Sequence, residues 1–250
     1  VTKKEIFIKK SFMTRIKLYA LLAGLLLTGV ITYAQTVDEI ISKNTAAMGG
    51  EAALKGIKSQ YMEGTMEMQG QTVPIKRWVK QNEAMRLEFE IMGTNNVQVV
   101  TPSIGWSLMP IMQQTEPQEM DAQTMKVMKS QLDLRGEFYD YKNRGKKIAL
   151  LGKDTVNGSM AYKLKVDGED GTNSIAYVDG TSFLLVKASN NVNVQGQDME
   201  IVTLLSDYKK TPEGIAYPGV TEQTPIGVKI NIDKVEMNKP VADSLFAKPH

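Results

Sequence analysis

Apolar and polar residues alternate along much of this chain, and the alternation constrains the fold more than any other feature. Met85, Leu87 and Phe89 alternate with Arg86 and Glu88. Because successive side chains of a β-strand point to opposite faces of a sheet, this pattern predicts a strand with one buried face. Similar runs predict strands over residues 61–68, 73–80, 84–91, 97–101, 154–156, 160–166, 175–178, 183–186, 199–208, 214–217 and 228–235.

Turn residues between these runs indicate that consecutive strands pair in antiparallel fashion. Asn157-Gly158 and Asp179-Gly180 stand between strand runs, where such dipeptides favour tight hairpins. Asp167–Gly171 predicts a looser, solvated turn, because it lacks the acidic spacing of a calcium-binding loop. Short strands with a turn about every ten residues predict one barrel-like or strongly curved antiparallel sheet.

Two segments depart from this pattern and are predicted to be helical. Residues 37–56 have apolar residues at helical spacing, with a glycine pair that breaks the helix, and residues 119–134 contain no glycine or proline. Within the second segment, Met125, Met128 and Leu132 lie on one stripe of a helix.

The N-terminal residues have the composition of a secretory signal peptide. A short basic stretch precedes an apolar run over residues 18–31, and small residues follow it. The alternative is a membrane anchor, but the run is shorter than the roughly 20 residues that cross a bilayer. We therefore expect an over-extended start over residues 1–12, a signal peptide over 13–34 that is cleaved after Ala34, and a single periplasmic domain over 35–250.

Composition excludes several kinds of chemistry. The chain has no cysteine and one histidine, His250, so a thiol nucleophile, a Ser-His-Asp triad and the usual zinc ligands are excluded. Residues 1–34 hold six of the 30 basic residues and one of the 28 acidic residues, and the remainder has a net charge of −3, which argues against nucleic-acid binding. We expect no catalytic residue, no metal, no cofactor and no enzymatic activity, although the many acidic residues leave a carboxylate pair open as an alternative.

Methionine is abundant, with 15 in the chain. Because its side chain is flexible and polarizable, methionine suits surfaces that accept varied apolar shapes, although a single methionine is more often ordinary core filler. We expect the second helix to be a deformable plug over an apolar cavity at the mouth of a barrel. The methionines on or near that helix are Met109, Met112, Met120, Met125 and Met128.

Several segments, in order along the chain, resemble motifs of the LolA/LolB-like lipoprotein carriers. One segment is similar to a W-V-K-R-P strand and the next to a V-S-D-G-x-x-L-W-x-Y-x-P hairpin. Later segments resemble a Y-x-L strand, a D-Y-x-x-x-x-G-I-x-x-P hairpin and an L-F-x-x-P ending. The matching residues are Trp78–Lys80, Val100–Pro110, Ala161–Leu164, Tyr208–Pro218 and Ser244–Pro249.

The resemblance implies a mainly β fold with a helical lid (α+β). It is an open, strongly curved antiparallel half-barrel of about ten strands, covered by an N-terminal helix and an inserted helix. In this family the arginine of W-V-K-R-P latches the lid. Gln81 stands at that position here, so Gln81 or the nearby Arg86 is the candidate latch. Met125, Met128 and Leu132 would belong to the lid helix.

Apolar residues in phase along the predicted strands are the candidates for the lining of the apolar cavity. A register shift of one residue would move a whole strand's set to the other face, and ordinary core packing is the alternative for each residue. The candidates are Trp78, Met85, Leu87, Phe89, Val99, Trp106, Leu108, Tyr162, Leu164, Ile175, Tyr177 and Ile201.

Together these features predict a monomeric periplasmic carrier that binds lipoprotein acyl chains or another lipid-like ligand and moves it towards the outer membrane. An inner-membrane export complex and an outer-membrane acceptor are the candidate partners. The alternative is a non-transporting envelope accessory protein that uses the same fold as a protein-docking surface, since a fold does not determine a function.

Overall fold

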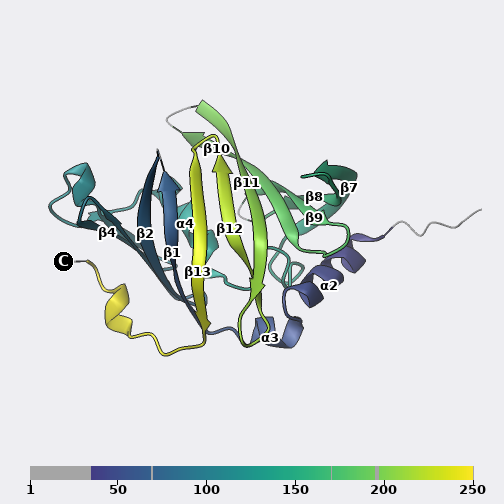
Figure 1. The fold of residues 1–250 in the computed structure, drawn as a ribbon, viewed down its shortest axis with the longest axis horizontal. Helices are drawn as coiled ribbons and strands as arrows, with labels where there is room; N and C mark the ends of the chain where they lie inside the picture. The colour runs from purple at the N-terminus through teal and green to yellow at the C-terminus, as the bar shows by residue number, and fades with distance from the viewer. Residues whose placement is uncertain (1–34, 69, 170, 195–196, 250) are drawn as a thin grey trace, which may run out of the picture. The chain divides into compact units, whose positions relative to one another are not determined.

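The computed structural model describes residues 35–68, 70–169, 171–194 and 197–249 (Figure 1). Of the two compact units into which the chain divides, residues 1–35 and 36–250, the second holds nearly all of them. The expected over-extended start and signal peptide lie outside the described residues. Within the described ranges, none of the helices has the length and apolar character needed to cross a membrane.

Thirteen strands form one antiparallel sheet in the described part of the chain, a few more than expected. The first six are β1 (Ser59–Met68), β2 (Gln71–Lys80), β3 (Ala84–Ile91), β4 (Thr94–Val100), β5 (Gly105–Leu108) and β6 (Gln118–Glu119). The others are β7 (Lys147–Val156), β8 (Ser159–Asp167), β9 (Asn173–Asp179), β10 (Leu185–Val194), β11 (Gln197–Lys210), β12 (Ala216–Thr224) and β13 (Val228–Met237).

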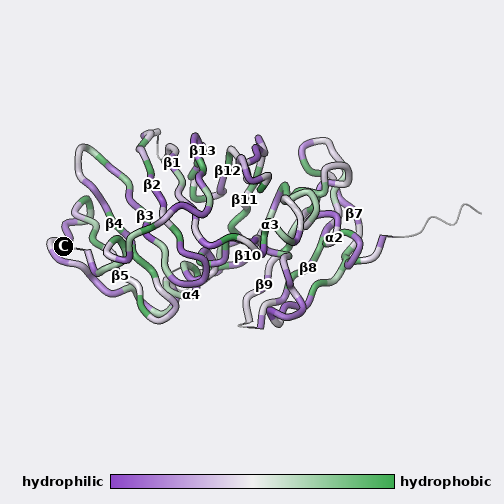
Figure 2. Tube along the Cα trace, turned by 90° about the horizontal axis from the view of Figure 1, so that it is seen from below, coloured by the Kyte–Doolittle hydropathy of each residue, from purple (hydrophilic) through white to green (hydrophobic). Residues whose placement is uncertain are grey.

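The sheet is an open, curved half-barrel, as predicted. Its strand order is β6-β5-β4-β3-β2-β1-β13-β12-β11-β10-β9-β8-β7, so β6 and β7 are the two edges and β1 pairs with β13 between them. Figure 2 shows the sheet curving, with α4 (Ala122–Lys129) on the side towards which it curves. All connections are hairpins except the one between the two edge strands.

Within the described residues, two helices precede the sheet. They are α2 (Val37–Ala47) and α3 (Glu51–Lys55), which together match the predicted broken helix. A capping box begins α2, because the Thr36 hydroxyl accepts from the Glu39 N–H and the Glu39 carboxylate accepts from the Thr36 N–H. Between the helices Gly49 has a φ of 127°, and a Cβ there would lie 2.9 Å from the carbonyl oxygen of Gly214. This close approach brings the helix pair onto the loop before β12.

The predicted helix over residues 119–134 is shorter in the structure. It comprises α4 and the 3₁₀ helix η2 (Ser130–Leu132). The Asp121 carboxylate accepts from the N–H groups of Gln123 and Thr124, and this N-cap starts the helix at Ala122. The residues before it pair with β5 as the short strand β6.

Both predicted hairpins are confirmed, with loops of different length. Asn157 and Gly158, both with positive φ, form a two-residue turn between β7 and β8. Asp179-Gly180 also begins a hairpin, between β9 and β10, but its loop is longer, because the Asp179 carboxylate accepts from the N–H groups of Thr181 and Ser182. Strand β10 therefore begins at Leu185 rather than at residue 183.

One face of the sheet, here called the inner face, holds the main apolar clusters. Helix α2 packs on β8 and β9, the α3 region packs on β1 and β2, and α4 packs on β2, β3 and β4. Residues 120–146, here called the lid segment, connect β6 at one edge to β7 at the other. Because the sheet is open, this single connection covers apolar surface that strand closure would otherwise bury.

We expect Ile40→Ala to lower the free energy of unfolding by about 2–5 kcal/mol, because the Ile40 side chain is fully buried between α2 and the β8–β9 face. Urea unfolding followed by circular dichroism measures the loss. Ile226→Ala is the matched control, since Ile226 is exposed and its truncation should change stability by about 0.5 kcal/mol or less. Equal losses in both variants would contradict this packing.

Candidate functional site: the lid-covered inner face

Half of the residues predicted to line a cavity lie on the inner face. Residues opposite each other in an antiparallel pair share a face, so the strand register assigns every side chain. Met85 lies opposite both Val79 and Val100, which belong to the cluster under α4, and Leu164 and Ala176 lie opposite each other under α2. The predicted residues on the inner face are Met85, Leu87, Phe89, Tyr162, Leu164 and Ile201.

The other half lie on the opposite, outer face, which differs from the expectation. Trp78 lies opposite Arg86, and Arg86 lies opposite Val99, so these three share the outer face. The alternation changes parity between neighbouring strands: odd-numbered residues of β3 face inward, whereas even-numbered residues of β4 do. Hairpin lengths set this parity, and strand periodicity alone does not reveal it. The predicted residues on the outer face are Trp78, Val99, Trp106, Leu108, Ile175 and Tyr177.

The C-terminal residues cover part of this outer face. The Arg86 guanidinium donates to the Leu245 carbonyl oxygen at 3.0 Å and pairs with Glu88 at 2.6 Å. The ammonium of Lys248 lies 4.3 Å from the centroid of a Trp106 ring. Arg86 therefore contacts the C-terminal segment rather than the lid segment, and the structure places it away from the latch position for which it was a candidate.

The lid segment inserts apolar side chains onto the inner face. Met125 and Leu132 are only 7 % and 5 % exposed, and they pack with Val79, Met85 and Val100. Met120 and Met128 pack against the same cluster. Gly105 permits the close approach, because a Cβ there would collide with the sulfur atoms of Met120 and Met125. The lid thus occupies the surface that an apolar ligand would require.

Gln81 holds the lid segment in place from the end of β2. Its amide nitrogen donates to the Asp133 carboxylate at 2.7 Å, and its amide oxygen accepts from the Leu134 N–H at 2.8 Å. Beside it, the Asn82 N–H donates to the Leu132 carbonyl oxygen at 2.9 Å. One side chain and one backbone group therefore fasten the residues that follow α4, at the position where the resemblance implied a latch.

Asp133 connects this latch to the rest of the lid segment. Its carboxylate accepts from the Arg135 guanidinium and pairs with Arg144 at 3.1 Å, and Arg144 in turn donates to the carbonyl oxygens of Gly136 and Tyr139. Burial raises the pKa of the Asp133 carboxyl, but the hydrogen bonds from Arg135 and Gln81 and the charge of Arg144 outweigh burial and hold that pKa well below its ordinary value. The carboxylate form is thus the one that fastens the lid.

One polar residue of the inner face was missed by the sequence analysis. Arg77 lies between Ile75 and Val79 on β2, in phase with both, opposite Met62 and Leu87. The signal was present, because a basic residue interrupts an otherwise apolar inward-facing set. The predicted lining includes Trp78, an apolar residue of the opposite phase on the same strand, instead.

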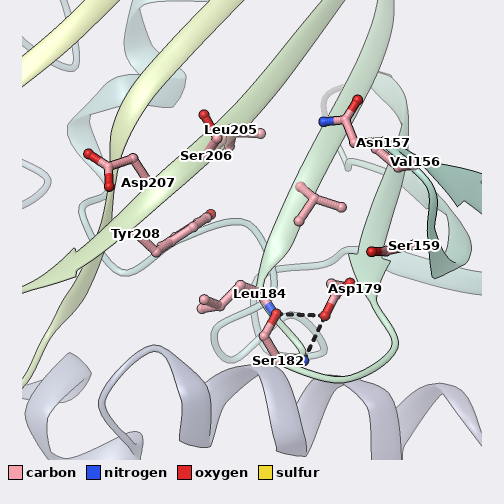
Figure 3. A pocket seen from close by; sticks show the side chains of 11 residues that line it. Val156, Asn157, Ser159, Asp179, Ser182, Leu184, Leu205, Ser206, Asp207 and Tyr208 are labelled. Atoms are coloured by element: carbon pink, nitrogen blue, oxygen red, sulfur yellow. Dashed lines mark hydrogen bonds between the residues drawn. The ribbon is translucent and has the colours of Figure 1, made fainter.

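A separate cavity lies away from the lid. It has a volume of about 320 Å³ and lies between the β7–β8 turn, the β9–β10 loop and β11 (Figure 3). Its lining is mixed, with Ser206 and Tyr208 on one side and Asn157 and Asp179 on the other, and Asp179 is already hydrogen-bonded to Ser182. None of the twelve predicted lining residues borders it.

Comparison with solved structures shows which fold this is. A LolA superfamily protein from Nitrosomonas europaea matches with a TM-score of 0.56 at 14 % identity, over 86 % of this chain and 99 % of that one. The chain has a LolA-like fold. A domain described as an outer membrane lipoprotein-sorting protein, from Vibrio parahaemolyticus, matches with a TM-score of 0.53 at 12 % identity, over 84 % of this chain and 95 % of that one.

A third match to the LolA-like fold is a DUF1329 family protein from Desulfovibrio piger. Its TM-score is 0.51 at 12 % identity, over 85 % of this chain and 98 % of that one. No protein-family model and no curated protein sequence matches the chain. At these identities the comparisons establish the LolA-like fold, and function has to be argued from the residues of the inner face.

Gln81→Ala is expected to loosen the lid, because it leaves the Leu134 N–H and the Asp133 carboxylate short of one partner each, a loss of about 1–3 kcal/mol. Limited proteolysis should then cleave within residues 120–146 about tenfold faster than in the wild type. Glu83→Ala, which alters an exposed side chain in the same turn, is the control. Equal cleavage rates for Gln81→Ala and the wild type would rule out the latch.

The Asp133 network predicts a pH dependence. Because the pKa of Asp133 is lower in the folded than in the unfolded chain, its contribution to stability is present above the ordinary pKa of 3.8 and is lost as the pH falls below it. The difference in melting temperature between the wild type and Asp133→Asn should be largest near neutral pH and should shrink below about pH 4. A difference that stays constant down to about pH 3 would contradict this role.

Proposed function

We propose that the protein is a periplasmic carrier whose inner face binds the acyl chains of a lipoprotein, or another lipid-like ligand, after the lid segment moves away. The observation that supports this most strongly is the kind of contact that the lid makes. Met125 and Leu132 cover the inner face through apolar packing alone, whereas a few hydrogen bonds hold the lid segment, at Gln81 and Asp133, at Asp38 of α2 and at Gly105 of β5. An acyl chain offers the same apolar contact and can take the place of the lid side chains on the inner face.

The energies of the two states are comparable, which a reversible carrier requires. Each methylene buried from water contributes about 0.8 kcal/mol, so an acyl chain of a dozen methylenes gains roughly 10 kcal/mol before the costs of ordering it. That gain has to offset the lid contacts, which include four nearly buried side chains worth about 1.5–3 kcal/mol each, Met125, Leu132, Phe138 and Tyr139. The free energies of the loaded state and the closed state then differ by a few kcal/mol, and exchange between them needs no catalytic step.

The carrier role also rests on the sequence. The expected signal peptide would deliver the chain to the periplasm, where an inner-membrane export complex would supply the ligand and an outer-membrane acceptor would receive it. Transfer between them would exchange one buried apolar surface for another. A lipoprotein-sorting description belongs to the structural match from Vibrio parahaemolyticus, and it supports the proposal through the shared fold.

A second candidate function is docking to a protein partner without transport. It is favoured by exposed apolar side chains near the β3–β4 turn and the 3₁₀ helix η1 (Pro110–Met112): Met92 is 81 % exposed and Met112 is 66 % exposed. The Ile111 N–H donates to the Asn96 side chain, which joins η1 to β4. Exposed apolar patches of this kind often mark interaction surfaces.

Met125→Asp is expected to tighten the apparent affinity for a fluorescent fatty-acyl probe. A carboxylate at this buried position destabilises the closed lid, and the apparent dissociation constant falls as the binding-competent fraction rises. Fluorescence titration of the purified protein measures the change. Val127→Asp is the matched control on the same helix, since Val127 is 50 % exposed and should leave the affinity unchanged.

The same titration separates the two candidate functions. A probe that binds the wild type, with an affinity that changes in Met125→Asp but not in Val127→Asp, supports the carrier. If the probe binds neither the variants nor the wild type, the carrier proposal is wrong. The docking function then predicts that the double variant Met92→Asp/Met112→Asp no longer captures a protein partner.

A further inference from the structure

Arg77 lies in the middle of the inner face, among apolar side chains. Its neighbours across the sheet are Met62 on β1 and Leu87 on β3, and Ile75 and Val79 flank it in the same phase on β2. Leu134 of the lid segment packs against the apolar clusters that contain Ile75 and Val79. Arg77 is partly exposed and therefore lies on the face that the lid segment packs on, close to the residues that the lid contacts.

The guanidinium has no negatively charged partner. One terminal nitrogen donates to the neutral Gln60 side chain at 2.6 Å, whereas the Nε atom is buried and has no hydrogen-bond partner. None of the ion pairs in the described ranges includes Arg77. Burial alone lowers the pKa of Arg77, with no contribution from a nearby acid.

Such an arrangement is unfavourable for the closed protein. Taking a cation out of water without an anion to pair with costs free energy, and an apolar side chain of similar length would pack there without that cost. A purely structural role for Arg77 is therefore poorly supported, since its only polar contact from the guanidinium is to one glutamine. The unpaired Nε–H group of Arg77 is instead available to donate a hydrogen bond to a ligand.

Arg77 shares one row of the inner face with polar residues further along the sheet. Leu87 separates Arg77 from Gln98 on β4, and Gln98 lies opposite Ser107 on β5. The rows on either side are mainly apolar and contain Phe89 and Met85, although Asn96 and Gln60 also belong to them. An amphiphile with a polar head and an apolar chain fits this surface, because the head can meet Arg77 while the chain covers the apolar residues beside it.

We propose that Arg77 binds the carboxylate or phosphate headgroup of a single-chain anionic amphiphile, whose chain lies on the apolar rows beside it. This inference rests on the proposed carrier function and narrows its ligand class. A guanidinium pairs with carboxylate or phosphate through parallel hydrogen bonds, and Nε is one of the donors that such a pair uses. A chain joined to a protein through an ester or amide offers no charge at that end, so the free anionic lipid is the favoured cargo.

The test compares ligands of equal chain length that differ in charge. Decanoate and decanol compete with the neutral fluorescent probe N-phenyl-1-naphthylamine for the purified protein at about pH 8, where the carboxylate is ionised. In the wild type, decanoate should displace the probe at about tenfold lower concentration than decanol, despite the greater polarity of decanoate. Inorganic phosphate is the third competitor, and it should not displace the probe.

Three variants accompany the wild type. Arg77→Met should lose the preference for decanoate while retaining decanol binding, and its melting temperature should stay the same or rise, because a partly buried charge without an anionic partner is removed. Arg77→Lys should keep part of the preference, which shows that charge matters in a folded protein. Lys76→Met, on the outer face of the same strand, should behave as the wild type.

The outcomes separate this inference from the proposed function. If decanol and decanoate bind the wild type equally, or if Arg77→Met weakens both to the same extent, the headgroup role of Arg77 is wrong while the carrier function stands. If neither displaces the probe, both fail. Displacement by inorganic phosphate would overturn the assignment to a lipid, because the site would then bind a free anion.

Discussion

An antiparallel sheet that does not close has to cover its apolar face with something other than strands, and the rest of this structure depends on how the chain does so. Helices α2 and α3 cover part of that face, and the lid segment, residues 120–146, covers another part, because it runs from one edge strand to the other and packs Met125 and Leu132 on the inner face. A closed barrel would have no need of it. A segment that is connected at both ends but packed through apolar side chains can leave as a unit and return.

The hydrogen bonds that hold the lid segment differ in kind from its apolar packing. Gln81, the Asn82 N–H and the Asp133 network are directional and few, whereas the contacts of the lid methionines are non-directional and can be replaced by any apolar chain. Arg77, partly exposed on the same face and without an anionic partner, would be stabilised by a suitable anion in the loaded protein. Both features lower the free energy needed to exchange the lid for a ligand.

Within each strand, the sequence predicted which residues share a face, because a period of two is visible in residues such as Met85, Leu87 and Phe89. It failed where the parity between strands mattered: Val99 and Trp106 face outward because the hairpin lengths shift the phase by one residue. Only the family resemblance pointed to Gln81. Arg77 was not predicted, although it is in phase with the inward-facing Ile75 and Val79. How far Gln81 and Arg77 are buried, and which hydrogen-bond partners they have, can be known only from the folded chain.

The claim that ligand and lid compete for one surface is tested most directly by amide hydrogen exchange with and without decanoate bound. The N–H groups of Asn82 and Leu134, which hold the lid segment closed, should exchange faster in the loaded protein, while the inner strands β2 and β3 stay protected. Unchanged or slower exchange at these two amides in the loaded protein would show that the ligand binds without displacing the lid, and would contradict the exchange mechanism.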